Sequence, residues 1–363
     1  MSRLIKYAAF VKEILKGHVT GRHIPILVTL CVTNRCNIRC VYCYEEYYER
    51  NHREFTTEEL LNLIDELACM GTKYISINGG EALLRKDIET IIDRINERNI
   101  LCHFATNGIL VKKNIPVLKK VDSLAISLDG KEESNDLNRG KGTYDQIIEA
   151  IECLRENRIN FQTHTVLTGN NPNAVDEVMD LALRYGFNAQ FSILRKEDSP
   201  NGQINLDAEG IKAVLKKILD YKKRGFPIFF SYNSYKDALN WPFSYDRQMV
   251  FNDLPHNYKN RVCYLKRFAC HIEANGLVYP CVVLINKFKA LNFQEVGFKK
   301  AWKNLEDCDC NLCYNICQND LNNIFGLRSD VVWNAFKIVA NRLFHGNKKS
   351  DLLVLDKDIS HRR

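Results

Sequence analysis

Three cysteines lie within eight residues of one another near the start of the chain, in the stretch CNIRCVYCYE at positions 36–45. Three residues separate Cys36 from Cys40, and two separate Cys40 from Cys43. Thiolates bind zinc and iron–sulfur clusters, and a closed site of either kind has four ligands. A set of three therefore predicts a [4Fe–4S] cluster in which one iron remains open to a further ligand. A structural zinc site is the alternative, and it would need a fourth ligand such as His52, the nearest histidine.

Seven further cysteines lie between Cys263 and Cys317, in the stretches RVCYLKRFACHIEANGLVYPC (261–281) and CDCNLCYNIC (308–317). The pair Asn-Gly at 275–276 between apolar runs predicts a hairpin with a two-residue loop, a register that places Cys270 opposite Cys281. Four cysteines of this region would close a second metal site, with a structural zinc ribbon as the alternative. We interpret the remaining cysteines as small buried apolar residues: Cys31, Cys69, Cys102 and Cys153.

The composition is that of a globular protein without a membrane span. The chain has 363 residues, of which 45% are hydrophobic and 26% charged, and its formal net charge is +7. No apolar run is long enough to cross a bilayer, and no secretion signal is present. We therefore expect a cytoplasmic location, where cysteines bind metals more often than they form disulfides. The modest charge, with no recognition motif, argues against nucleic-acid binding.

The elements that must position these cysteines alternate regularly along the chain. Helix-period stretches separate apolar runs rich in β-branched residues, which predicts parallel strands joined by right-handed crossovers. Six such units form an open or partial barrel, a (β/α)6 relative of the TIM barrel, with a small cysteine-rich C-terminal domain. The predicted strands are 26–33, 74–78, 101–105, 123–128, 161–167 and 189–194, and the predicted helices are 57–70, 87–98, 144–156 and 174–185.

Polar and glycine-rich clusters follow the ends of four successive strands. The first cysteine group follows the first strand, and NGGEALL (78–84), TNG (106–108) and SLDG (127–130) mark the ends of the next three. The carboxyl ends of parallel strands share one rim, so we expect the four clusters to converge there. Each cluster alone is typical of a β-turn, but their common position favours a ligand site.

With these motifs in order, residues 25–195 resemble the partial barrel of radical S-adenosylmethionine (SAM) enzymes. The spacing of Cys36, Cys40 and Cys43, with Tyr42 before the last cysteine, is similar to the cluster loop of that family. The resemblance implies that the amino and carboxylate groups of SAM chelate the open iron. One electron then cleaves the sulfonium to give a 5′-deoxyadenosyl radical, which abstracts hydrogen from a substrate or adds to it. A small donor such as flavodoxin or ferredoxin would supply the electron.

The resemblance also implies which residues bind SAM. The backbone of Tyr42 and the side chain of Leu194 would lie near the adenine, and Ser127 would hydrogen-bond the cofactor. The guanidinium of Arg139 would grip the SAM carboxylate with a planar fork, which lysine lacks. The complete implied set is Tyr42, Gly79, Gly80, Glu81, Ser127, Asp129, Arg139 and Leu194.

The Gly-Gly-Glu turn would receive the methionine ammonium. Gly79 and Gly80 would allow close backbone approach, and the Glu81 carboxylate would counter the positive charge. One departure from the family pattern is Ala82, which stands where proline is usual and makes the turn less rigid.

The second cysteine group resembles the auxiliary-cluster module called twitch, a shortened relative of the SPASM module. The resemblance implies an auxiliary iron–sulfur cluster, with Cys270 and Cys317 as reserves for its ligands. Val282 stands where sulfatase-maturing relatives carry a catalytic aspartate, which argues against that activity. The implied ligands are Cys263, Cys281, Cys310 and Cys313.

We expect four regions: a basic amphipathic helix (1–24), the barrel (25–230), the auxiliary module (231–325), and a basic C-terminal helix and tail (326–363). The two terminal helices would either dock on the barrel or bind an anionic membrane surface. The segment before residue 26 is too short for the leader-binding domain of many peptide-modifying relatives.

The main hypothesis is therefore a radical SAM enzyme that acts on a lipid or polyprenyl chain at the inner face of the membrane. The first alternative is a peptide-modifying (RiPP-type) radical SAM maturase. An alternative of another class is a non-catalytic iron–sulfur or zinc-binding structural protein.

Overall fold

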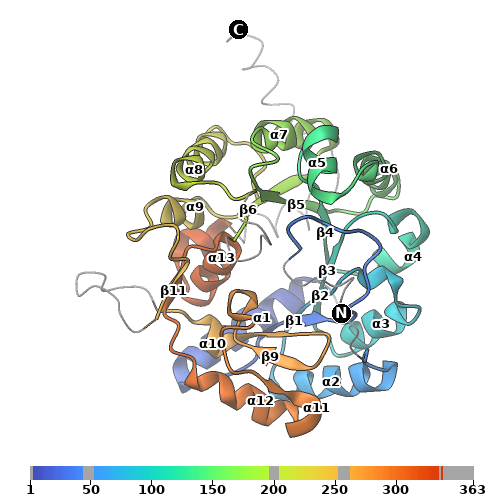
Figure 1. Cartoon of the computed structure of the whole chain (residues 1–363). Coiled ribbons are helices and arrows are strands. Elements are labelled where there is room, and N and C mark those ends of the chain that lie inside the picture. Colours follow the sequence, from blue (N-terminus) through green and yellow to red (C-terminus); the bar gives the residue numbers. More distant parts are fainter. Residues whose placement is uncertain (1–2, 44–52, 196–203, 252–261, 335–336, 338–363) are drawn as a thin grey trace.

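The computed structural model describes residues 3–43, 53–195, 204–251, 262–334 and 337. Within them, nine strands form one sheet in the order β10-β9-β8-β1-β2-β3-β4-β5-β6. Strands β1 to β6 pair in parallel. Figure 1 shows these strands in the middle of a ring of helices, with the orange C-terminal hairpin beside the blue strand β1. The predicted α/β partial barrel is confirmed.

The strands are β1 Leu27–Cys31, β2 Tyr74–Asn78, β3 Leu101–Thr106, β4 Ser123–Ser127, β5 Gln162–Leu167, β6 Asn188–Ile193, β7 Met249–Val250, β8 Ala269–Ile272, β9 Leu277–Tyr279, β10 Leu291–Asn292 and β11 Leu312–Cys313. The helices are α1 Arg3–Thr20, α2 Thr57–Met70, α3 Ile88–Glu97, α4 Ile115–Leu118, α5 Glu132–Arg139, α6 Thr143–Glu156, α7 Ala174–Tyr185, α8 Ala208–Lys223, α9 Tyr232–Leu239, α10 Leu265–Phe268, α11 Phe293–Val296, α12 Phe298–Asn304 and α13 Ile316–Phe325.

Helix α2 shows why the sequence pattern predicted this part of the chain well. Thr56 and Glu59 form a capping box at its start, and Gly71 ends it in the left-handed conformation, with φ +104°. Both are local signals, because each depends only on residues within one helical turn. The bounds of α2, α7 and β2 accordingly match the predicted ranges.

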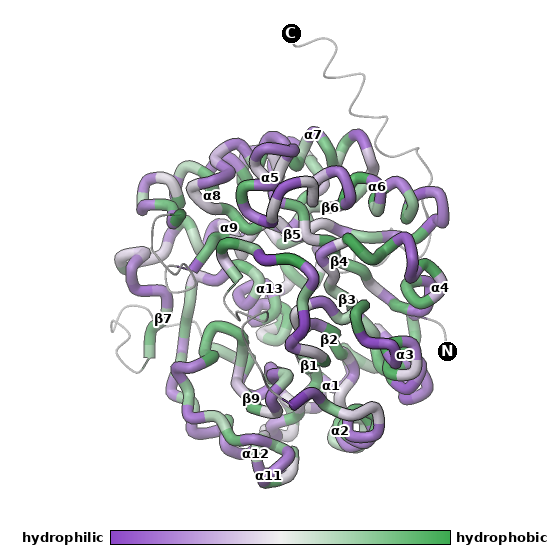
Figure 2. The backbone as a smooth tube through the Cα atoms, turned by 45° about the vertical axis from the view of Figure 1, so that its right-hand side comes forward, coloured by the Kyte–Doolittle hydropathy of each residue, from purple (hydrophilic) through white to green (hydrophobic). Residues whose placement is uncertain are grey.

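The helices cover the outer face of the sheet. Val28 and Leu30 of β1 belong to the same buried cluster as Leu60 and Ile64 of α2. Because successive strand residues point to opposite faces, Cys31 points to the barrel interior instead. Figure 2 shows the corresponding alternation on the outer helices, where hydrophilic and hydrophobic stretches follow one another along α6 and α7.

Helix α1 closes the barrel at the end opposite the rim that carries the motifs. The ring of Phe10 lies 6.0 Å from that of Tyr74, which begins β2. Gly17 packs against Phe268, the residue before β8, so closely that a Cβ atom would lie 2.4 Å from the ring. Lys6 is buried and pairs with Asp122, which precedes β4, at 2.8 Å. The helix therefore docks on the amino ends of the strands.

Docking does not use the whole of α1. An apolar stripe on its outer side remains exposed, and it consists of Leu4, Ile5, Val11, Leu15 and Val19. The corresponding C-terminal basic stretch lies mostly outside the described residues. No described helix has the length and apolar character needed to span a membrane.

The hairpin formed by β8 and β9 differs from the prediction. His271 pairs with Tyr279, and the amide of Gly276 donates to the carbonyl of Glu273 at 2.9 Å. The loop therefore has three residues, ending in Gly276 at φ +90°, a common hairpin alternative to the two-residue turn. A shift of one residue moves side chains to the other face. The predicted pairing of Cys270 with Cys281 was wrong for this reason, and Cys270 lies in the outer core.

We predict that Lys6→Ala lowers the free energy of unfolding by about 1–3 kcal/mol, because it removes a buried ammonium that donates hydrogen bonds to the side chains of Asp122 and Asn96. Urea denaturation followed by circular dichroism measures the change. Lys12→Ala is the matched control, since Lys12 is an exposed residue of the same helix and its loss should cost less than about 0.5 kcal/mol. Equal effects of the two substitutions would contradict the docking contact.

Candidate active site

The loop that carries Cys36, Cys40 and Cys43 follows β1 and is fixed at two points. On one side, the amide of Gly80 donates to the carbonyl of Thr33 at 3.0 Å, so the turn after β2 holds the start of the loop. At the other point, the later part of the loop is hydrogen-bonded to the last turn of α5, where the amide of Val41 donates to the carbonyl of Asn138 at 2.9 Å. The loop thus bridges the rim from β2 to α5.

The two glycines after β2 are required by this loop. A Cβ atom on Gly80 would lie 2.2 Å from the carbonyl oxygen of Arg35, and one on Gly79 would lie 2.6 Å from that of Thr33. Gly79 also has φ +138°, which other residues rarely adopt. The sequence predicted that these two glycines allow SAM to approach the backbone closely. In this structure the backbone of the cluster loop makes that close approach.

Glu81 links the turn after β2 to the turn after β3. Its buried carboxylate accepts hydrogen bonds from the Thr106 hydroxyl at 3.0 Å, the Asn107 amide at 2.8 Å and the Leu83 amide at 3.1 Å. Burial raises the pKa of Glu81 to about 7, even though the hydrogen bonds from these donors act to lower it. Asn107 in turn reaches the cluster loop, since its side-chain amide lies 3.9 Å from the Cys36 sulfur. Contact of the Glu81 carboxylate with the methionine ammonium stays a prediction.

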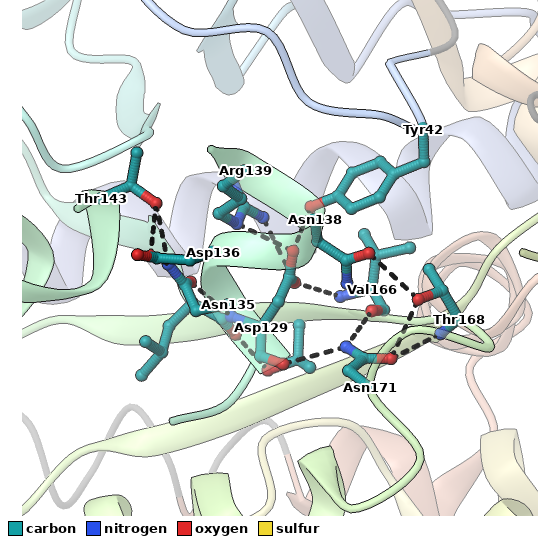
Figure 3. Close-up of polar contacts among 12 residues, drawn as sticks. Tyr42, Asp129, Asn135, Asp136, Asn138, Arg139, Thr143, Val166, Thr168 and Asn171 are labelled. Carbon is teal, nitrogen blue, oxygen red and sulfur yellow. Dashed lines mark hydrogen bonds and ion pairs between the residues drawn. The ribbon is translucent and has the colours of Figure 1, made fainter. Parts of the chain in front are cut away.

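Asp129, fully buried after β4, gathers three segments of the site (Figure 3). It forms an ion pair with Arg139 of α5 at 2.8 Å and accepts a hydrogen bond from the Val166 amide of β5 at 2.9 Å. The hydroxyl of Tyr42 donates to the same carboxylate, which brings in the cluster loop. Burial opposes the charge of Arg139, but Asp129 outweighs it and raises the pKa of the guanidinium.

This network assigns side-chain contacts that sequence reasoning did not. Tyr42 was implied only through its backbone and Arg139 only as a partner of SAM, yet both hold Asp129, and the guanidinium also lies 5.6 Å from the centre of the Tyr42 ring. The buried side-chain amide of Asn171 donates to the backbone carbonyls of Asp129 and Val166, both at 2.9 Å. The spacing of the SLDG motif gave no signal for these partners.

The remaining predicted residues lie on the same rim. Ser127 ends β4 and is half-buried, whereas Leu194 directly follows β6 and is buried. Sequence reasoning missed His164 of β5, which bonds to the Ser192 hydroxyl at 2.9 Å. Burial lowers the pKa of His164 to about 4, so the ring is neutral at pH 7. The alternation of β5 places it on the inner wall.

The rim fits a [4Fe–4S] cluster and SAM. Burial raises the pKa of Cys36 and that of Cys40, the latter to about 12, and the neighbouring Cys43 adds to both shifts. These two thiols therefore stay protonated unless a metal supplies positive charge. Beside them, the side-chain nitrogen of Asn138 is buried without a hydrogen-bonding partner among the described residues, a donor suited to a polar ligand. His52, the candidate for a zinc ligand, lies outside the described residues.

Five cysteines of the C-terminal region surround one small cavity. Four are those implied by the resemblance, and the fifth, Cys308, was not predicted although it stands two residues before Cys310. The reserves do not line this cavity: Cys270 lies in the outer core, and Cys317 packs against the same core. Among the scattered cysteines, Cys31 and Cys102 are buried as predicted, Cys153 is half-buried and Cys69 is exposed. The cysteines that line the cavity are Cys263, Cys281, Cys308, Cys310 and Cys313.

We predict that Asp129→Asn weakens the affinity for SAM at least about tenfold, because Arg139 is left buried without its counter-charge, at a cost of about 3–5 kcal/mol. Calorimetric titration of the anaerobically reconstituted protein with SAM measures this effect. Tyr42→Phe removes only one hydrogen bond to Asp129 and should cause a smaller loss of affinity in the same direction.

Asp180→Asn is the control, since Asp180 is exposed and pairs with Lys131 at the surface. If Asp129→Asn and Asp180→Asn bind SAM equally well, the buried network does not organise the site.

Comparison with known proteins agrees with this geometry. Residues 30–182 match the model of the Radical SAM superfamily. Mycofactocin maturase MftC of Mycolicibacterium smegmatis is 32% identical over 317 residues, which cover 82% of this chain and 74% of that protein.

Two solved structures have the same fold. Streptococcus suis SuiB bound to precursor peptide SuiA superposes with a TM-score of 0.61 at 18% identity, covering 80% of this chain and 67% of SuiB. The enzyme anSMEcpe with bound AdoMet and Cp18Cys peptide gives a TM-score of 0.59 at 19% identity, covering 88% and 99%. The match to the family model and the 32% identity to MftC together show that the chain belongs to the radical SAM superfamily, whose members are enzymes that use a [4Fe–4S] cluster and SAM.

Proposed function

We propose that this radical SAM enzyme modifies a peptide substrate, with its SAM-binding cluster held by Cys36, Cys40 and Cys43. The observation that carries the cluster assignment is the position of these three cysteines on the rim, in a loop that is hydrogen-bonded to the turn after β2 and to α5. Three thiolates leave one iron open for the amino and carboxylate groups of SAM. When bound, the cluster and SAM supply a 5′-deoxyadenosyl radical that attacks the substrate.

The chain's own residues orient the cofactor and exclude water. Arg139 gives part of its donor fork to Asp129 and has further N–H groups for the SAM carboxylate. Asn138, on the same turn of α5, offers a buried amide nitrogen to the same region. We assign the methionine ammonium to the turn of Gly79, Gly80 and Glu81, where the backbone carbonyls would supplement a carboxylate that already accepts hydrogen bonds from Thr106, Asn107 and Leu83. Ser127 and Leu194 complete the contacts along the rim.

A peptide is favoured over a lipid by two observations. A relative that matches 82% of this chain is named a maturase, and two solved structures of the same fold contain peptides. The lipid hypothesis required an active site that opens beside a membrane-binding helix, but α1 covers the opposite end of the barrel from the cysteines. A bilayer bound at α1 would therefore lie on the side of the barrel away from the cysteines.

We further propose that the cavity in the C-terminal region holds an auxiliary iron–sulfur cluster. Burial raises the pKa of Cys263 and of Cys281, and neighbouring cysteines add to the effect for Cys281, so these thiols too need a metal to become ligands. Cys310 and Cys313 complete the proposed ligand set, with Cys308 as an additional thiol beside them. Flavodoxin or ferredoxin is the electron donor that fits a cytoplasmic enzyme of this kind.

We predict that anaerobically reconstituted and reduced protein converts SAM to methionine and 5′-deoxyadenosine, and that Cys40→Ala abolishes this conversion, because two thiolates cannot hold the cluster. Cys69→Ala is the matched control, since Cys69 is exposed and remote from both cysteine groups in sequence. Chromatography of 5′-deoxyadenosine gives the rate for each variant.

The substrate is tested in the same assay. A short peptide encoded beside this gene should stimulate 5′-deoxyadenosine formation and change in mass, whereas polyprenyl phosphates should do neither. Stimulation by the polyprenyl compound alone would restore the lipid hypothesis, and full SAM cleavage by Cys40→Ala would remove the cluster assignment.

A variant in which Cys36, Cys40 and Cys43 are all alanine should retain about four irons in a cluster that does not respond to SAM. Adding Cys281→Ala should remove this iron, while adding Cys270→Ala should not, because Cys270 faces the outer core. Iron analysis and absorption spectra measure both. Zinc in place of iron would show that the cavity is a structural zinc site.

A further inference from the structure

Three buried side chains with metal-binding atoms meet where β8 joins β1. They are Cys31, the last residue of β1, His271 in β8, and Glu273 just after it. Their ligand atoms all lie within 4.8 Å of one another, and none of the three side chains is more than 2% exposed. They belong to neither cysteine group, so the SAM site and the auxiliary cavity do not account for them.

The strands point these side chains into the barrel. Leu30 and Ile272, their neighbours in sequence, both lie in the outer core, so Cys31 and His271 lie on the inner face. Strands β1 and β8 run in parallel, and each lends the cluster side chains from its carboxyl end. The cluster is therefore built from adjacent backbones in a continuous sheet, which holds the ligand atoms in fixed relative positions.

The distances suit a tetrahedral ion. Cys31 Sγ lies 3.6 Å from His271 Nε2, and a zinc ion with bonds of about 2.3 Å to sulfur and about 2.0–2.1 Å to nitrogen separates these two atoms by about 3.6 Å. Glu273 Oε1 lies 4.0 Å from the same sulfur and in direct contact with Nε2. Binding of the ion would therefore require the carboxylate to rotate away from the ring.

The chemistry of the ligand set selects the ion. A thiolate and an imidazole suit Zn²⁺, whereas Mg²⁺ and Ca²⁺ prefer oxygen ligands. A thiolate and a carboxylate also neutralise the two charges of Zn²⁺, so an occupied site would add no net charge to the buried interior. Three protein ligands are typical of zinc sites that leave one position open.

We propose that Cys31, His271 and Glu273 bind one Zn²⁺ ion whose fourth position faces the barrel interior and accepts an oxygen ligand. This site is separate from both cysteine groups, and it does not depend on the substrate of the enzyme.

Metal analysis of protein isolated without oxygen, after growth with zinc, should give about one zinc per chain in addition to the iron. Cys31→Ala and His271→Ala should each lower the zinc to less than about a fifth of that amount, with iron content and SAM binding retained as evidence of folding. Cys102→Ala is the matched control, because Cys102 is also a buried cysteine on a barrel strand but belongs to no such group of metal-binding side chains among the described residues. This control should keep the zinc.

X-ray absorption at the zinc edge distinguishes the proposed site from zinc bound in the auxiliary cavity. The proposed site gives one sulfur and two or three nitrogen or oxygen neighbours, while the cavity would give sulfur neighbours only. Zinc that persists in Cys31→Ala, a shell of sulfur alone, or wild-type protein without zinc would each overturn the proposal. In the last case the three side chains form a hydrogen-bonded cluster in which the thiol and the ring both donate to the carboxylate.

Discussion

The ion pair between Asp129 and Arg139 is the interaction on which the proposed SAM site depends. A buried carboxylate is costly unless its oxygens are fully used, and here Arg139, Tyr42 and the Val166 amide use them. These partners come from α5, the cluster loop and β5, so one carboxylate sets the relative positions of three segments that are distant in sequence. The loop that carries Cys36, Cys40 and Cys43 is fixed on the rim at this end by Asp129 and at the other by the turn after β2.

Both cysteine groups share a second constraint, which is that burial disfavours the thiolate form. The effect raises the pKa of Cys40 to about 12 and raises that of Cys263 and Cys281 as well. A metal ligand must lose its proton, so metal binding in either group has to provide the free energy that burial removes. The protein therefore couples the assembly of its clusters to the completion of its fold.

The sheet also determines how the two ends of the chain relate to the chemistry. Strand β8 pairs with the side of β1 that β2 leaves free, so the C-terminal hairpin continues the barrel sheet. Arg195, which follows β6, donates a hydrogen bond from its guanidinium to the carbonyl of Val282 at 2.9 Å. Helix α1 covers the amino ends of the strands, which leaves the carboxyl rim as the side that we propose for SAM and the substrate. This division is the usual one for barrel enzymes, in which one face is catalytic and the other contributes stability.

The sequence by itself determined the features that depend on local signals. The capping box of α2, the alternation of strand residues and the spacing of Cys36, Cys40 and Cys43 each involve neighbours in the chain, and they were sufficient for the barrel and for its family. The same local reasoning failed for the β8–β9 hairpin, because Asn-Gly is compatible with a two-residue and a three-residue loop, and only packing chooses between them.

Only the tertiary structure decided which side chains share a partner. Asp129 and Tyr42 are 87 residues apart, and Cys31 and His271 are 240 apart, so no periodicity connects them. Cys31 was interpreted as an apolar residue because it lies outside both cysteine groups in the sequence. Its polar partners lie on and just after β8, a strand from the C-terminal part of the chain. The physical reason is that strand pairing in a barrel joins residues by position in the sheet rather than by distance along the sequence.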